Sequence, residues 1–222
     1  MIKCCGGEIY MKEFEIYTKK LLEWNEKINL TAITNPEEIQ TKHFEDSLTC
    51  LKTGYIKDSD FVVDVGTGAG FPGLPLKIVN KSLRLTLMDS LNKRLMFLAD
   101  LTRELDLNVN IVHIRAEDAG KDMAYREKFD VAVSRAVANL RTLCEYCLPL
   151  VKPNGYFLAM KGKDCQEEIE NAKDLIETLG GKVEEVQLHT LSDEEITHSI
   201  IVIKKVQRTP NKYPRTGKKI GQ

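Results

Sequence analysis

The sequence predicts an α/β fold, with a mostly parallel seven-stranded sheet, helices on both of its faces and a helical cap at the N-terminus. From residue 61 onward, seven short stretches rich in β-branched and aliphatic residues alternate with helical patterns. Such alternation is typical of a parallel sheet that helices cover on both faces. A glycine-rich turn also follows the first of these stretches, which gives the order strand, turn, helix.

The first sixty residues are expected to form the helical cap. Apolar residues recur at helical spacing over residues 8–29 with Lys and Glu between them, which predicts an amphipathic helix. Asn35 and Pro36 predict the start of a second helix with Asn35 as its N-cap, and a third is expected over residues 45–52. We therefore divide the chain into a cap (1–58), a core (59–206) and a C-terminal tail (207–222).

The expected elements of the core follow one another with short connections. The predicted strands are Phe61–Val65, Leu83–Met88, Val109–Ile114, Phe129–Ser134, Gly155–Met160, Lys182–Gln187 and Ser199–Lys204. The clearest helical patterns between them are Leu91–Leu105, Leu140–Leu150 and Asp164–Leu179. Only a short link joins the last two strands, so these two can pair antiparallel.

The glycine turn is the most informative motif of the chain. It reads Asp64-Val65-Gly66-Thr67-Gly68-Ala69-Gly70-Phe71-Pro72-Gly73. The three alternate glycines allow a tight turn and a close approach of the main chain to a ligand. A dinucleotide loop needs a different glycine spacing and free N–H donors for phosphate, and Pro72 has no N–H. The pattern favours S-adenosylmethionine, as in Rossmann-like methyltransferases, over a nucleotide-phosphate loop or a purely structural turn.

Polar residues follow the expected strands at the edge where parallel sheets bind ligands. Asp89 closes the second strand, where an acid can accept hydrogen bonds from ribose hydroxyls; alternatively, it caps the following helix. Arg135 follows an apolar strand, so it is expected to face the crevice or to pair with an acid there. Lys161 and Lys163 are expected to form a positive lip on the same crevice.

Composition limits the class of protein. The formal net charge is −1, and the start of the chain has no signal-peptide pattern, so a cytoplasmic protein without a membrane span is expected. Six cysteines without framework spacing indicate reduced thiols, and a metal or redox role for Cys144 and Cys147 stays the minor alternative. The residues after Lys204 carry basic side chains and no acid, which predicts an extended tail that contacts nucleic acid or only aids solubility.

Hydrolytic chemistry is not indicated, because the chain has no nucleophile elbow, Walker loop or H-E-x-x-H motif. The four histidines are scattered along the sequence, so no metal site is expected.

Several motifs together resemble one family. They are Trp24-Asn25 with Ile28-Asn29-Leu30-Thr31, His43-Phe44 with Asp46-Ser47, the glycine turn, Leu87-Met88-Asp89-Ser90 with Lys93-Arg94, Ser134-Arg135-Ala136, Lys161-Gly162 and Tyr213-Pro214-Arg215. In this order they resemble the RsmG (GidB) family, the 16S ribosomal RNA methyltransferases G. The resemblance extends from about residue 21 to the C-terminus. The last residues, from Thr216 on, depart from the family's proline-containing ending.

The resemblance implies an enzyme that transfers a methyl group from S-adenosyl-L-methionine to N7 of a guanine in the 530 loop of 16S rRNA. It places Gly66, Phe71, Ala116, Glu117 and Arg135 at the cofactor. The glycine turn adds Gly68 and Gly70, and the end of the second strand adds Asp89. His43 and Asp46 are expected near substrate or cofactor. The expected partner is 16S rRNA or the small ribosomal subunit, and the protein is expected to be a monomer without metal or membrane.

The expected chemistry assigns no catalytic residue. N7 of guanine carries a lone pair and no proton, so the transfer requires alignment and no general base. Glu117 or Asp46 could stabilise the positive charge that moves to the base. Three alternatives stay open: a methyltransferase acting on another RNA or a small molecule, an NAD-linked enzyme, and a non-catalytic rRNA-binding assembly factor.

Overall fold

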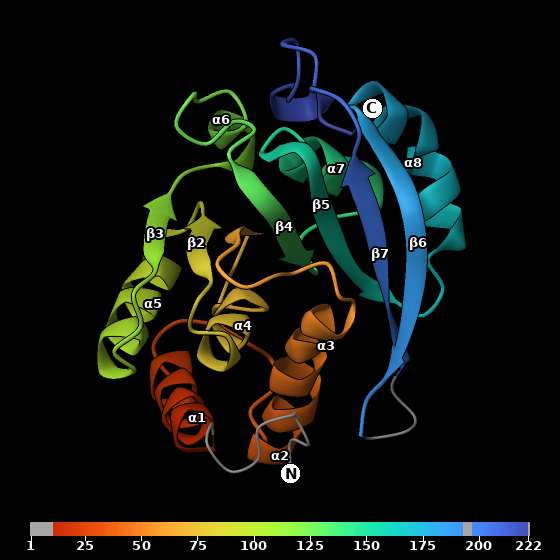
Figure 1. Ribbon diagram of the computed structural model, residues 1–222. Helices are drawn as coiled ribbons and strands as arrows, with labels where there is room; N and C mark the ends of the chain where they lie inside the picture. Colours follow the sequence, from red (N-terminus) through yellow and green to blue (C-terminus); the bar gives the residue numbers. More distant parts are fainter. Residues whose placement is uncertain (1–10, 193–196, 222) are drawn as a thin grey trace.

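A computed structural model describes residues 11–192 and 197–221, and Figure 1 shows its arrangement. The chain begins with a group of helices before the first strand. They are α1 (Met11–Asn25), α2 (Pro36–Ile39), the π-helical turn η2 (Gln40–Glu45) and α3 (Asp46–Lys52). The side chain of Asn35 accepts hydrogen bonds from the main-chain N–H groups of Glu37 and Glu38, so the predicted N-cap is confirmed.

A seven-stranded sheet forms the centre of the molecule (Figure 1). Its strands are β1 (Phe61–Val65), β2 (Arg84–Asp89), β3 (Asn110–His113), β4 (Phe129–Arg135), β5 (Val151–Gly162), β6 (Gly181–Thr190) and β7 (Thr197–Lys205). Their order across the sheet is β3-β2-β1-β4-β5-β7-β6. The first five strands pair in parallel, while β7 lies antiparallel to both β5 and β6. The predicted sheet, including its antiparallel end, is confirmed.

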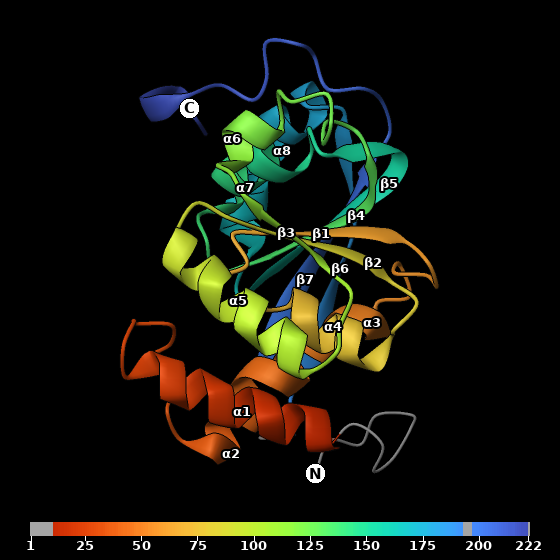
Figure 2. The ribbon, with the colours of Figure 1, turned by 90° about the vertical axis from the view of Figure 1, so that its left-hand side faces the viewer.

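Helices cover both faces of this sheet, as the edge-on view of Figure 2 shows. The helices after β1 are α4 (Gly73–Val79), α5 (Asn92–Glu104), α6 (Ala116–Ala119), α7 (Leu140–Cys147) and α8 (Gln166–Thr178), and the short 3-10 turn η3 spans Gly217–Lys219. In Figure 2 the N-terminal helices lie below the sheet with α4 and α5, and α6, α7 and α8 lie above it. Two apolar clusters fill these two layers.

The N-terminal helices share their apolar cluster with the sheet. Phe14, Tyr17 and Leu21 of α1 are buried in the same cluster as Val62 of β1 and Phe97 of α5. The helical cap is therefore packed directly onto the core. The proposed division at residues 58 and 206 stays a prediction, and residues 1–10 and 222 lie outside the described residues.

Two local features differ from the sequence-based expectation. The expected third helix is present as α3, but residues 40–45 form a π-helical turn that joins it to α2 without a break, which the sequence did not predict. Strand β5 begins at Val151, four residues before its expected start, and its register with β4 shifts between Phe129 and Val131. Both are backbone irregularities that leave the apolar pattern nearly unchanged, so periodicity does not reveal them.

The described cysteines are all reduced and buried: Cys50, Cys144, Cys147 and Cys165. Burial raises the pKa of the Cys144 and Cys147 thiols well above the usual value, which disfavours the thiolate that metal binding or redox exchange requires. Cys4 and Cys5 lie outside the described residues. Within the described ranges no helix is both long and apolar enough to span a membrane.

Candidate cofactor and active site

A cavity of about 500 Å³ opens at the carboxyl ends of the parallel strands. Strands β1, β2 and β4 end at it, and the helical cap closes one side. Its lining includes seven of the eight residues predicted to bind the cofactor: Gly66, Gly68, Phe71, Asp89, Ala116, Glu117 and Arg135. It also includes Leu30, Thr31 and His43 of the cap and Tyr146 of α7.

The glycine turn forms the floor of the cavity. Gly66 has φ +69° and Gly68 has φ +59°, in the left-handed region that favours glycine. A Cβ on Gly66 would lie 2.6 Å from Cγ2 of Val137, which faces it from the loop after β4. The N–H groups of Gly66 and Thr67 donate to the carbonyl of Met88, at 2.9 and 3.0 Å, so the turn is fixed to the end of β2.

Asp64 lies beneath this turn and holds its shape. Its Oδ2 accepts hydrogen bonds from Thr67 Oγ1 at 2.7 Å and from Gly73 N at 2.8 Å. Its side chain is fully buried, and burial raises the pKa of this carboxyl to about 6 despite these two donors. Among the described residues its Oδ1 has no hydrogen-bond partner.

Gly70, the eighth predicted residue, does not line the cavity but faces the cap. A Cβ there would overlap the Tyr17 hydroxyl and would lie 2.7 Å from Cδ1 of Leu74. The same hydroxyl donates to the carbonyl of Ala69 at 2.5 Å. The ring of Tyr17 stacks on that of Phe71 with 5.2 Å between centroids. This glycine therefore allows α1 to approach the turn closely.

Asp89 lies at the end of β2 and is 4% exposed. Its Oδ2 accepts from Gly68 N at 2.9 Å and lies 3.4 Å from Nη1 of Arg94, and its Oδ1 accepts from Leu91 N at 2.9 Å. The bond to Leu91 lies just before α5, whose N-cap is Leu91 without a side-chain capping bond, so Asp89 does not cap this helix. The carboxylate lines the cavity and keeps acceptor capacity, because two oxygens offer about four lone-pair sites.

Arg135 joins the sheet to the helical cap across the cavity. Its Nη1 donates to Asp46 Oδ2 at 2.8 Å and to the carbonyl of Lys42 at 3.1 Å. Asp46 in turn pairs through Oδ1 with Nδ1 of His198 on β7, at 2.7 Å. Arg135 thus both faces the cavity and pairs with an acid. His198 is 152 positions from Asp46 in sequence, and no local motif predicts this contact.

The protonation of these groups follows from their neighbours. Burial raises the pKa of Asp46, but His198 and Arg135 outweigh burial, and the net pKa lies below its usual value. The hydrogen bond to Asp46 raises the pKa of His198. Asp46 is therefore an ionised group held between Arg135 and His198, and it does not line the cavity.

His43 is a neutral group in the cavity wall. Burial, then the charge of Arg135, lowers its pKa to about 4. Because Nη2 of Arg135 donates to Nδ1 at 3.2 Å, Nε2 carries the proton and donates to Thr31 Oγ1 at 2.8 Å. The imidazole stacks on Phe71 with 4.5 Å between ring centroids.

Several cations of the expected positive lip and basic tail make contacts inside the fold. Lys161 donates to the carbonyl of Ala138 at 2.8 Å and to Glu168 at 2.7 Å, and it does not line the cavity. Lys205 is fully buried, and burial lowers its pKa to about 8. Arg215 pairs with the buried Glu145 of α7. Exposed cations of these segments are Lys163, Arg208, Lys212 and Lys219.

Residues 11–192 and 197–221 contain no group of three or more His, Cys, Asp or Glu side chains that could hold a metal ion. The expectation that the protein needs no metal stays a prediction.

Comparison with known proteins shows which family this chain resembles. The model of a family described as GidB, rRNA small subunit methyltransferase G, matches residues 10–197. A ribosomal RNA small subunit methyltransferase G of Alkaliphilus metalliredigens (strain QYMF) is 55% identical over 90% of this chain and 84% of its own length. The protein of that name from Thermoanaerobacter sp. (strain X514) is 50% identical over 93% of this chain and 86% of its own length.

Solved structures share the fold at low identity. A mutant of MtNAS in complex with S-adenosylmethionine is 13% identical, with a TM-score of 0.60, over 89% of this chain and 75% of its own. TrmN from Thermus thermophilus is 14% identical, with a TM-score of 0.55, over 72% of this chain and 48% of its own. These likenesses support the Rossmann-like arrangement of sheet and helices.

Proposed function

The chain belongs to the rRNA small subunit methyltransferase G family, and from this membership we infer that it transfers a methyl group from S-adenosylmethionine to N7 of a guanine in the 530 loop of 16S rRNA. It is an S-adenosylmethionine-dependent enzyme, and small-subunit rRNA is its substrate.

The cavity supports this function because its residues suit the parts of the cofactor. A Cβ on Gly68 would meet no atom closer than the Gly66 carbonyl oxygen at 4.0 Å, so the floor there leaves room for a ligand against the main chain. The Asp89 carboxylate offers acceptors for ribose hydroxyls, and Arg135 offers a cation for a carboxylate. Ala116, Glu117 and Tyr146 supply a wall for the adenine. We propose these roles for the residues predicted from the sequence; Gly70 instead serves the packing of α1.

The arrangement suits a transfer that needs no proton acceptor. When bound, S-adenosylmethionine supplies a methyl group on a positively charged sulfur. The neutral His43 and the ring of Phe71 place apolar and aromatic surface in the wall beside Arg135, whose charge is balanced by Asp46. The wall therefore adds little net positive charge to oppose a base that becomes cationic. Of the two acids expected to stabilise that charge, Glu117 lines the cavity and Asp46 does not.

The finer points are proposals as well. We propose that the enzyme acts in the cytoplasm as a monomer, without a metal ion, and that exposed cations such as Lys163, Lys212 and Lys219 contact rRNA phosphates. Activity should then fall steeply with rising salt, because each phosphate contact releases counterions. A flat salt response would remove these contacts from the proposal.

The decisive experiment is transfer of tritiated methyl groups to small subunits and to 16S rRNA that lack the modification. Label in N7-methylguanosine that maps to the 530 loop is expected. Gly66→Ala should abolish most of the label because its Cβ would lie 2.6 Å from Cγ2 of Val137, which lines the cavity, whereas Gly162→Ala, where a Cβ meets nothing within 4 Å, should retain it. Label in another nucleoside, or none despite cofactor binding, would direct the search to other RNAs and small acceptors.

A further inference from the structure

The C-terminal segment, residues 206–221, does not extend freely from the sheet. After β7 it crosses the end of the molecule and passes over α6 and α7 (Figures 1 and 2). Thr209 is 3% exposed and Tyr213 is 8% exposed, and Tyr213 belongs to the apolar cluster that contains Ala119 and Leu143. We refer to this segment as the strap.

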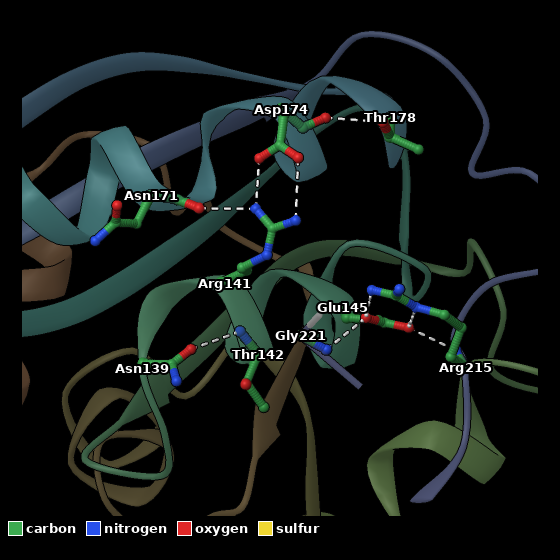
Figure 3. Close-up of polar contacts among 9 residues, drawn as sticks. All are labelled: Asn139, Arg141, Thr142, Glu145, Asn171, Asp174, Thr178, Arg215 and Gly221. Atoms are coloured by element: carbon green, nitrogen blue, oxygen red, sulfur yellow. Dashed lines mark hydrogen bonds and ion pairs between the residues drawn. The ribbon is translucent and has the colours of Figure 1, made fainter. Parts of the chain in front are cut away.

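Glu145 of α7 fastens the far end of the strap. Its side chain is fully buried and accepts hydrogen bonds from Arg215 N at 2.6 Å, Nε at 2.9 Å and Nη2 at 2.7 Å, and from Gly221 N at 2.9 Å (Figure 3). Burial opposes ionisation of Glu145, but these donors outweigh it and the pKa of Glu145 is lowered. A buried carboxylate with four donors is a strong and specific anchor.

Arg126 fastens the near end of the strap beside α6. Its guanidinium donates to the carbonyls of Gly120 at 2.6 Å, Tyr213 at 2.8 Å and Thr209 at 2.7 Å. Gly120 follows α6 directly, and a Cβ there would lie 2.8 Å from Cγ of Pro214. The strap is therefore in close contact with the end of α6.

The same two helices form the adenine wall of the cavity. Ala116 and Glu117 of α6 and Tyr146 of α7, the neighbour of Glu145, line it. Helix α6 has only four residues, and its N-cap residue, Arg115, makes no side-chain capping bond. One helical turn has little stability of its own, so its position depends on what packs against it.

We propose that the strap positions the adenine wall, with Glu145 and Arg215 as its clasp, and thereby sets the affinity for the cofactor. This inference rests on the proposed function, because it assumes that the cavity binds S-adenosylmethionine. Glu145 and Arg215 are positioning residues that act through α6 and α7. Because Glu145 binds its guanidinium, Arg215 supports cofactor binding and does not make the contact with RNA phosphate that was expected from the sequence.

Arg215→Ala tests the clasp, and Lys219→Ala is its control, because it removes an exposed cation of the same segment. The dissociation constant of S-adenosylhomocysteine is measured by calorimetry, well below the melting temperature of each variant. Arg215→Ala should weaken binding roughly three- to thirtyfold, the range found for residues that affect a site without contacting its ligand. Adenosine should lose the same factor. Arg215→Lys keeps the charge without the planar fork and should fall between.

A second variant covers the case in which Arg215→Ala fails to fold. Replacement of both partners, Glu145→Met with Arg215→Met, removes the clasp without leaving a buried charge, and such apolar replacements are often neutral in stability. The same loss of affinity for S-adenosylhomocysteine is expected. The KM for small subunits, at saturating cofactor, should stay within about threefold of wild type in Arg215→Ala and in the double variant.

Unchanged affinity for S-adenosylhomocysteine in Arg215→Ala or in the double variant would overturn the inference. So would a raised KM for small subunits with unchanged cofactor affinity, which would make the strap an RNA-binding arm. Absence of S-adenosylhomocysteine binding by the wild-type protein would instead overturn the proposed function.

Discussion

Replacement of Asp46 by Asn should destabilise the protein more than the same kind of replacement at any exposed acid. Asp46 is 1% exposed and lies between Arg135 at 2.8 Å and His198 at 2.7 Å. It joins three parts of the chain: the helical cap, the end of β4 and the start of β7. The asparagine keeps the shape of the side chain, removes its charge and leaves Arg135 without its anionic partner.

The size of the effect follows from burial. Removal of one partner of a buried ion pair costs 3–5 kcal/mol, because the other charge stays away from water. Arg135 has 15% of its side chain exposed and keeps its contacts with His43 and the carbonyl of Lys42. We therefore expect the lower end, about 3 kcal/mol. For a chain of this length that corresponds to a fall in melting temperature of about 6–12 °C.

The loss should also depend on pH. The pKa of His198 is raised in the folded protein by its hydrogen bond to Asp46. The stability from this proton is fully present below the unfolded pKa of about 6.5 and is lost as pH rises through the raised folded value. The difference between wild type and Asp46→Asn should thus be larger at about pH 6 than at about pH 8.

The assay is urea unfolding followed by circular dichroism at both pH values, with Glu38→Gln as the matched control. Glu38 lies in the same helical cap and pairs with Lys42 in solvent, so its replacement should cost less than about 0.5 kcal/mol. A loss below about 1 kcal/mol for Asp46→Asn, or a loss equal at both pH values, would refute the reasoning.

Three further predictions rest on single contacts. Gly70→Ala should lower the melting temperature by several degrees or more, because its Cβ would overlap Tyr17 and its φ is +96°, while Gly162→Ala should not change it. Gly66→Ala should weaken S-adenosylhomocysteine binding in calorimetry by at least about tenfold, since its Cβ would displace Val137 in the cavity wall and about 1–3 kcal/mol of backbone strain at φ +69° favours another conformation of the turn; equal affinity would contradict this. Burial lowers the pKa of Lys205 to about 8, so between that pH and about 10.5 the unfolded chain binds more protons than the folded protein. The free energy of unfolding of the wild type, relative to that of Lys205→Met, should therefore rise with pH in this window. Parallel pH profiles of the two proteins would contradict the burial effect.

The sequence by itself determined the strands, the order of the elements and the location of the cavity. Residues close together in the sequence determine the strand and helix periodicity, the Asn35 cap and the glycine turn. Parallel strands then bring their carboxyl ends to one edge of the sheet. For this reason seven of the eight predicted cofactor residues line one cavity. The family resemblance supplied the reaction, which the residues alone left open among several classes.

Only the tertiary structure decided which polar groups meet. His198 pairs with Asp46, Arg215 with Glu145, and Gly70 faces Tyr17 across 53 positions of chain. Local sequence cannot show these contacts, because the energy of a charge depends on its burial and on the nearest opposite charge in space. A segment that composition describes as a basic tail therefore becomes, once Glu145 is buried beneath it, a strap over the adenine wall.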